Sequence, residues 1–123
     1  MELTDTHCHL YWNKFDADRA EVIQRAIGAV VTHFLVPGTN LETSRAAIQL
    51  AETHEQVHAA VGFHPTDLDT WNENAMENLR NLAQSADKIV AIGEIGLDYY
   101  WVKEESKRAI QREVLRRQLA FAA

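Results

Sequence analysis

Short apolar segments alternate along the chain with longer segments in which apolar residues recur every three or four positions. The short segments predict four strands, over residues 3–7, 29–36, 57–63 and 89–94. The longer segments predict four helices, over residues 16–28, 40–51 and 74–85 and from about residue 104 to the end. Asp16 and Asn40 stand where a residue that caps a helix N-terminus is expected.

Strands that are joined each time by a helix lie parallel in one sheet. Two strands carry continuous apolar runs, which predicts that they are buried on both faces: Val30-Val31 with Phe34-Leu35-Val36, and Ile89-Val90-Ala91-Ile92. Polar residues follow each strand, at the edge where parallel α/β sheets carry their sites. The sequence therefore predicts an α/β protein with its site at the carboxyl ends of the strands.

Composition and charge limit the classes of function that the chain can have. The chain has 123 residues, of which 46 % are apolar and 24 % are charged, as in one globular domain. Its net charge of −6 argues against a generic basic groove for nucleic acid, so a polyanionic substrate would need a metal ion. Basic residues gather between positions 103 and 117, where a solvated helix face is favoured over a phosphate-binding stripe.

The N-terminal region lacks a basic and apolar leader, and no apolar run approaches the roughly 18 residues of a membrane span, which predicts a cytoplasmic protein. Cys8 is the only cysteine, so no intrachain disulfide can form, and a reducing compartment fits. Side-chain alternation places Cys8 behind the neighbouring histidines, where we expect a small buried residue rather than a ligand.

Two histidines and an aspartate close the first strand. Asp5, His7 and His9 occupy alternate positions, so on a strand they project from one face, which suits one metal ion. Imidazole is the commonest metal ligand, and a neighbouring carboxylate can orient it or join the ligands. A pair of ordinary half-buried histidines is the alternative.

His64 and Glu94 follow the third and fourth predicted strands. Pro65 fixes the chain direction after His64, and Glu94 lies between Gly93 and Gly96, where backbone can approach a ligand closely. Either residue alone would more often be a loop or surface residue. Together with the first three they place three imidazoles and two carboxylates on one rim of the sheet, a set suited to zinc or manganese.

These residues lie in motifs whose order and spacing resemble the TatD family over essentially the whole chain. The motifs are Asp5-Thr6-His7-Cys8-His9-Leu10, Phe15-Asp16, Val36-Pro37-Gly38, Ala60-Val61-Gly62-Phe63-His64-Pro65, the run from Ala91 to Tyr100, and Gln111 to Ala120. The resemblance implies a metal-dependent hydrolase of the amidohydrolase-like group on a (β/α)8 TIM-type barrel. The typical member is a deoxyribonuclease, supported by magnesium, manganese or zinc, that removes nucleotides from the 3′ end of DNA.

The resemblance also implies roles for individual residues. His7 and His9 would bind the first of two metal ions, and Glu94 would bridge or help bind the pair and could accept a proton. His64 would contact a substrate phosphate or the attacking water. Asp5 is interpreted as orienting one of the histidines. Two cations would polarise the phosphoryl oxygen and activate a water molecule.

One departure from the family is length, because a (β/α)8 barrel needs about 250 residues. We therefore expect residues 1–123 to form the N-terminal (βα)4 half of one barrel domain, with an incomplete site. A hydrolase of another ester on the same scaffold, such as an aminoacyl ester on transfer RNA, is the second hypothesis. The third is a non-catalytic half barrel, for which we expect association through its open sheet edges and weak binding of divalent ions.

Other histidines and aromatic residues are given lesser roles. His33 is expected to be a buried, hydrogen-bonded core residue, and neither His54 nor His58 is expected to be a ligand. Asp98 is expected to hydrogen-bond within its loop, and Trp71 to pack. The aromatic residues near the predicted rim could either stack on bases of a single strand or pack the loops as lids; these are Trp12, Phe15, Tyr99, Tyr100 and Trp101.

Overall fold

The computed structural model describes all residues from 1 to 123. Its four strands are β1 (Leu3–Asp5), β2 (Val31–Pro37), β3 (Val57–Val61) and β4 (Ile89–Ile92). Its helices are α1 (Arg19–Gly28), α2 (Leu41–Thr53), α3 (Ala75–Ala83) and α4 (Glu105–Ala122), with one 3₁₀ turn at Asn13–Phe15. All eight predicted elements are therefore present in the predicted order; β1, β3 and β4 end two residues earlier than predicted, and β2 begins two residues later and ends one residue later.

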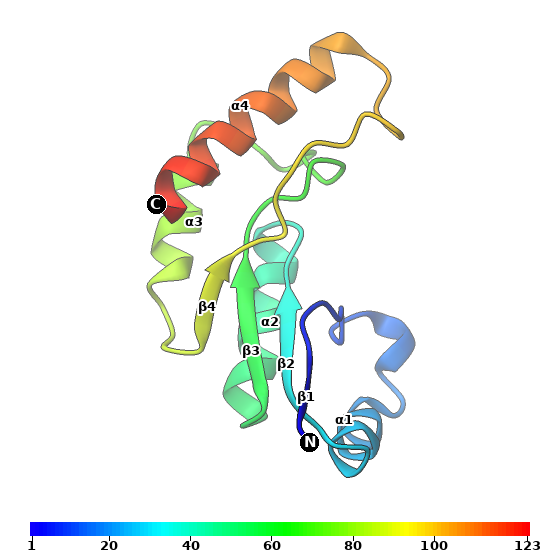
Figure 1. The fold of residues 1–123 in the computed structure, drawn as a ribbon. Helices are drawn as coiled ribbons and strands as arrows, with labels where there is room; N and C mark the ends of the chain where they lie inside the picture. The colour runs from blue at the N-terminus through cyan, green and yellow to red at the C-terminus, as the bar shows by residue number, and fades with distance from the viewer.

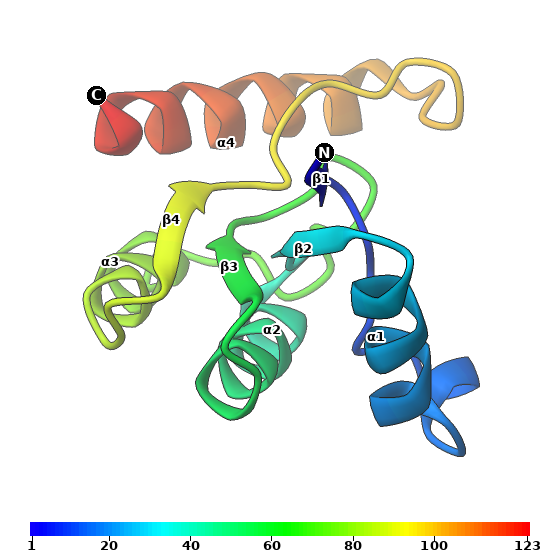
Figure 2. The same cartoon turned by 60° about the horizontal axis from the view of Figure 1, so that its bottom comes forward.

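The strands form one parallel sheet in the order β1-β2-β3-β4 (Figure 1). Helices α1, α2 and α3 lie along one side of this sheet (Figure 2), and α4 runs past the carboxyl ends of β3 and β4. The arrangement of four consecutive parallel βα units confirms the predicted α/β class and matches the first half of a (β/α)8 barrel. None of the helices combines the length and hydropathy that crossing a membrane requires.

The hydrophobic core lies between the sheet and these helices. Val36, Val61, Ile23 and Leu79 are fully buried there. Burial on both faces, predicted for β4, is wrong: Val90 is 57 % exposed, because the helices cover only one face of this edge strand. The expected burial of His33 is also wrong, since its ring is exposed, stacks on His58 and contacts the Thr32 hydroxyl.

The helix starts show which capping residues were predicted correctly. Asn40 caps α2 as expected: its side chain accepts a hydrogen bond from the Thr43 amide, and the Thr43 hydroxyl accepts one from the Asn40 amide. Asp16 does not cap α1, which begins three residues later. Its carboxylate instead accepts a hydrogen bond from the Arg19 guanidinium at 2.5 Å.

Candidate metal centre

His7, His9 and Glu94 converge on one point. The Nε2 atoms of the two histidines are 3.2 Å apart, and Glu94 Oε2 lies 3.1 Å from the first and 3.4 Å from the second. All three ligand atoms lie within 4.8 Å of one another, a spacing that one metal ion can span. The structure thus brings together the three residues that were predicted as metal ligands.

These residues reach the cluster from opposite edges of the sheet. His7 and His9 follow β1, and Glu94 follows β4, which lies three strands away. Parallel strands twist relative to their neighbours, and in barrels they also curl until distant strands meet. This curvature is what places residues 87 positions apart in the chain in contact.

His9 is held with a free ligand atom pointing into the cluster. Its Nδ1 lies 3.0 Å from the Pro37 carbonyl oxygen, which can only accept a hydrogen bond, so this nitrogen carries the proton. The Tyr11 hydroxyl lies 2.8 Å from the same nitrogen and donates to the same carbonyl. In the neutral ring, Nε2 therefore carries the lone pair that a metal requires. Burial lowers the pKa of His9, which favours this neutral form.

The backbone around His7 and His9 continues the pairing of β1 with β2. The Cys8 amide donates to the Leu35 carbonyl at 3.2 Å. Asp5, which was expected to orient an imidazole, instead accepts a hydrogen bond from the His7 backbone amide at 3.1 Å. The half-buried Cys8 packs against the core, and burial together with the charge of Asp5 raises its pKa to about 12. The thiol therefore stays protonated, in agreement with its predicted structural role.

Glu94 is positioned by two backbone hydrogen bonds and one close approach. The Gly93 amide donates to the Val61 carbonyl oxygen, and the Glu94 amide donates to the Gly38 carbonyl oxygen, both at 2.9 Å. A side chain at Gly62 would meet the Gly93 carbonyl carbon at 2.9 Å, so only glycine permits this approach. The carboxylate then faces His7 and His9 with Oε2 and His64 with Oε1.

His64 also lies beside Glu94, but its neutral ring is the other tautomer. Its Nδ1 accepts a hydrogen bond from the Thr66 amide at 3.1 Å, so in the neutral ring the proton lies on Nε2. That Nε2 lies 3.3 Å from Glu94 Oε1. His64 therefore presents a hydrogen-bond donor, where His9 presents a lone pair. The role expected for His64, contact with a substrate phosphate or the attacking water, stays a prediction.

An open cleft of about 450 Å³ lies over these residues. Its walls are His9, Trp12, Thr39, His64, Thr66, Asp67 and Glu94. Asp67 joins two of the surrounding loops, because its carboxylate accepts hydrogen bonds from the Thr39 hydroxyl at 2.7 Å and the Asn40 amide group at 2.8 Å. The cleft is thus bounded by loops that follow β1, β2, β3 and β4.

Two buried glutamines of α4 hold the loop that carries His64. Gln118 accepts a hydrogen bond from the Phe63 amide at 2.7 Å and donates to its carbonyl at 3.1 Å. Gln111 donates to the Pro65 carbonyl and to the Asp98 carbonyl, each at 3.1 Å, and accepts from the Asp98 amide. No positioning role was predicted for either residue. Their spacing of seven, which places both on one helix face, was the available signal.

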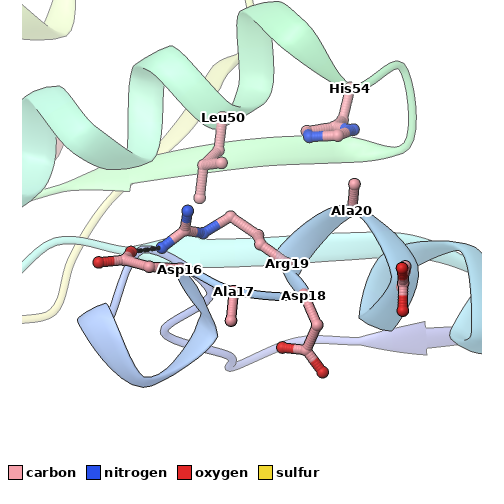
Figure 3. Close-up of a pocket in the computed structure, with 8 residues that line it drawn as sticks. Asp16, Ala17, Asp18, Arg19, Ala20, Leu50 and His54 are labelled. Atoms are coloured by element: carbon pink, nitrogen blue, oxygen red, sulfur yellow. Dashed lines mark hydrogen bonds and ion pairs between the residues drawn. The ribbon is translucent and has the colours of Figure 1, made fainter.

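Arg19 holds the segment after His9 in a similar way, and it too was not predicted. Its guanidinium donates to the backbone carbonyls of Leu10 at 2.7 Å, Tyr11 at 3.4 Å and Trp12 at 3.2 Å. Figure 3 shows this side chain between Asp16 and Leu50, in a separate pocket where α1 begins. That pocket contains His54 but none of the clustered site residues, so we assign it no catalytic role.

The aromatic residues near the cleft fall into two groups. The Trp12 ring stacks on the His9 imidazole, with centroids 5.0 Å apart and planes 9° apart, so it packs against a candidate ligand. Tyr99 packs under Arg108, and its hydroxyl accepts a hydrogen bond from Arg112 at 3.0 Å. The rings of Tyr100 and Trp101, by contrast, are largely exposed.

Other expectations for this region can be compared with the structure. Trp71 packs edge-on against Phe63, as predicted. Asp98 accepts a hydrogen bond from the Trp101 amide at 2.8 Å, which confirms its loop role. The basic side chains of α4 are mostly paired with its own glutamates, as in a solvated helix face; the pairs are Lys107–Glu104, Arg112–Glu105, Arg116–Glu113 and Arg117–Glu113.

Comparison with known proteins agrees with the geometry. Residues 4–123 match the family described as TatD related DNase. The chain is 39 % identical over 120 residues to the uncharacterized metal-dependent hydrolase YabD of Bacillus subtilis, covering 98 % of this chain and 46 % of that protein. It is 41 % identical over 111 residues to the 3′-5′ ssDNA/RNA exonuclease TatD of Cronobacter sakazakii, covering 90 % of this chain and 41 % of the relative.

The same similarity holds for a solved structure. The crystal structure of YjjV, a TatD homologue from Escherichia coli K12, superimposes with a TM-score of 0.86 at 35 % identity. The match covers 98 % of this chain and 46 % of that one. The chain therefore spans less than half the length of each of these proteins.

Proposed function

The chain belongs to the family of TatD related DNases, and on this premise we propose that it acts as a metal-dependent hydrolase that removes nucleotides from the 3′ end of DNA. One observation carries the proposal: His7, His9 and Glu94 meet with their ligand atoms within 4.8 Å. The Cronobacter relative, a 3′-5′ exonuclease on single-stranded DNA or RNA, supports the choice of substrate.

We propose that residues 1–123 contribute the (βα)4 portion of a barrel domain that further βα units complete. Support comes from relatives whose lengths are more than twice the matched part. A cytoplasmic location is part of the same proposal and is supported by the single cysteine, which forms no disulfide.

The donor set fits a divalent cation. Two imidazole nitrogens and a carboxylate oxygen suit zinc or manganese, and the protonated Nδ1 of His9 leaves its Nε2 ready to coordinate. Such a cation would supply Lewis-acid polarisation of the phosphoryl group. A second cation is part of the proposal, because Glu94 directs Oε1 away from the two histidines and toward His64.

The remaining chemistry is assigned to side chains of this chain. His64 would donate its Nε2 proton in a hydrogen bond to a non-bridging phosphate oxygen, since Thr66 fixes the ring in that tautomer. Glu94 would accept a proton from the attacking water while its backbone is held by Gly38. Asp5 would support the His7 backbone rather than act on substrate.

The proposal is tested with the intact protein and single-stranded DNA labelled at either the 5′ or the 3′ end. We expect stepwise release of nucleotides from the 3′ end that depends on manganese, magnesium or zinc. His9→Ala and Glu94→Gln should each lower the rate by more than about 100-fold, the upper range for groups that only orient a ligand. His33→Ala, which changes an exposed histidine outside the cluster, is the matched control and should retain activity.

Unaltered activity in both site variants would contradict the assignment. A substrate panel separates the second hypothesis, because a deacylase would release amino acids from aminoacyl-tRNA and leave DNA intact. Binding of manganese by the parent protein and its loss in Glu94→Gln provides a readout that does not depend on the substrate.

A further inference from the structure

We propose that Tyr100 and Trp101 form an aromatic platform that stacks on the bases of single-stranded nucleic acid and leads the strand to the metal centre. This inference rests on the proposed function and adds to it the residues that select single strands. The platform belongs to the segment between β4 and α4, which extends beyond the carboxyl ends of the strands (Figure 1).

The exposure of these two rings sets them apart from the other aromatic residues. Tyr100 is 71 % and Trp101 is 75 % exposed, and their rings meet edge to face with centroids 4.8 Å apart. Large exposed aromatic surfaces on soluble proteins commonly mark interaction sites. Both rings offer a free face to a planar ligand.

The loop that presents these rings is held in place. The Trp101 amide donates to Asp98 Oδ1 at 2.8 Å, and the backbone of Asp98 is bound on both sides by the buried Gln111. Arg108 donates to the Val102 carbonyl at 2.8 Å and to the Tyr99 carbonyl at 3.2 Å. A ligand that stacks on these rings therefore pays little entropy to order the loop.

The charges next to the platform favour a polyanion. Lys103 and Arg108 form no ion pair with a carboxylate, unlike Lys107, Arg112, Arg116 and Arg117 of α4. Lys103 Nζ lies 5.3 Å from the centroid of the Tyr100 ring, so a cation adjoins a stacking surface. Aromatic faces combined with cations are the usual means of binding single strands without reading their sequence.

The platform is also within reach of the metal centre. Trp101 follows Glu94 by seven residues, so their Cα atoms are at most about 25 Å apart. A cavity of about 310 Å³ is lined by Val102, which follows Trp101 in the chain, and by Thr66, which lies two residues after His64. Thr66 borders both this cavity and the cleft over the metal centre. A strand that leaves the cleft along Thr66 would thus enter the cavity lined by Val102, the residue next to Trp101 in the chain.

Bases in a duplex are already stacked and paired, so they cannot reach such a platform without unpairing. The test compares single-stranded (dT)12, whose bases can stack on the platform, with bis(p-nitrophenyl) phosphate, a phosphodiester that has no bases. Both are assayed with the intact protein and manganese. The variant is Tyr100→Ala with Trp101→Ala. Tyr100→Phe with Trp101→Phe keeps the ring faces, and Leu97→Ala removes an exposed apolar side chain from the same segment without removing a ring.

We expect the double alanine variant to raise the KM for (dT)12 at least fivefold per ring, the lower end for base stacking, or about 25-fold for both rings. Its kcat/KM for bis(p-nitrophenyl) phosphate should stay within twofold of the parent. The phenylalanine and Leu97→Ala variants should stay within threefold for both substrates. An unchanged KM for (dT)12, or an equal loss of kcat/KM on both substrates, would overturn the proposal that these rings form a platform.

A binding measurement separates this inference from the proposed function. If the parent protein cleaves neither substrate, the proposed function fails. Fluorescence anisotropy of labelled (dT)12 in EDTA then tests whether the platform binds single-stranded DNA. Loss of (dT)12 binding in the double alanine variant would support it, and equal binding would overturn it. A change in sedimentation without any change in (dT)12 binding would assign the rings to a protein contact instead, and would also overturn it.

Discussion

Two segments bring the candidate ligands to one point, and they are held in different ways. In the segment after β1 the His9 side chain is itself fixed, because it contacts the Pro37 carbonyl, Tyr11 and Trp12. The segments after β3 and β4 are fixed through their backbone, by Gln118 of the distant helix α4 and by close contact at Gly62. The first mode controls the orientation of a ring, and the second controls where a whole loop lies.

This difference separates two kinds of mutational effect. Removing a buried group that binds backbone leaves polar atoms without partners, which mainly lowers the free energy of unfolding. Removing a group that orients a ligand mainly lowers metal affinity. Unfolding by urea and binding of manganese measure the two effects separately.

The largest loss of stability is expected for Gln118→Leu. The substitution leaves both the Phe63 amide and the Phe63 carbonyl without partners in a fully buried place, at a cost of about 3 kcal/mol. Urea unfolding followed by circular dichroism measures this loss. Gln24→Leu on the exposed side of α1 is the control and should change stability by less than about 0.5 kcal/mol. A loss below about 1 kcal/mol for Gln118→Leu would contradict the proposed clamp.

Gly62→Ala should affect both quantities. The added Cβ would lie 2.9 Å from the Gly93 carbonyl carbon, so the backbone before Glu94 must move, at a cost of about 2 kcal/mol. Because Glu94 is displaced, calorimetric titration should also show weaker manganese binding. Gly28→Ala is the control, since nothing lies within 4 Å of its added Cβ, and we expect it to be neutral or stabilising. Unchanged manganese binding in Gly62→Ala would show that Glu94 is positioned by other contacts.

Arg19→Gln should lower both stability and metal affinity. The substitution removes the hydrogen bonds to the carbonyls of residues 10, 11 and 12. Two of these residues, Tyr11 and Trp12, contact the His9 ring with their side chains. We expect about 1 kcal/mol less stability and about tenfold weaker manganese binding. Arg25→Gln, at an exposed guanidinium 3.8 Å from Asp18, should leave both unchanged. If Arg19→Gln lowered stability without changing manganese binding, the backbone of residues 10–12 would not contribute to the orientation of His9.

The smallest effect is expected for Glu113→Gln, which lies away from both segments. Arg117 and then Arg116 hold the pKa of this exposed carboxyl below its ordinary value of 4.5. A lowered pKa means that the pair stabilises the fold above pH 4.5 and that this contribution disappears as the pH falls through the lowered pKa. The urea midpoints of parent and variant should therefore differ slightly at pH 7 and converge in acid and in 1 M salt. A difference that grows in acid would contradict this sign.

Much of the fold was predictable because it depends on local chemistry. The alternation of apolar segments located all eight elements, and the Asn40 and Thr43 capping box set the start of α2. Predictions were wrong where they depended on which face of the sheet the helices cover, or on which partner a side chain binds. Val90 and His33 are exposed because the three helices cover one face of the sheet, and Asp16 binds Arg19 instead of capping α1.

The sequence by itself determined the strand and helix order and the identity of the candidate ligands, because periodicity and residue type are local properties of the chain. Only the tertiary structure decided that the ends of β1 and β4 meet, since this depends on the curvature of the whole sheet. It also decided which nitrogen of His9 and of His64 faces the cleft, because that follows from the carbonyl or amide packed against the other nitrogen. Packing likewise decided that the Trp12 ring stacks on the His9 imidazole while the Trp101 ring stays largely exposed.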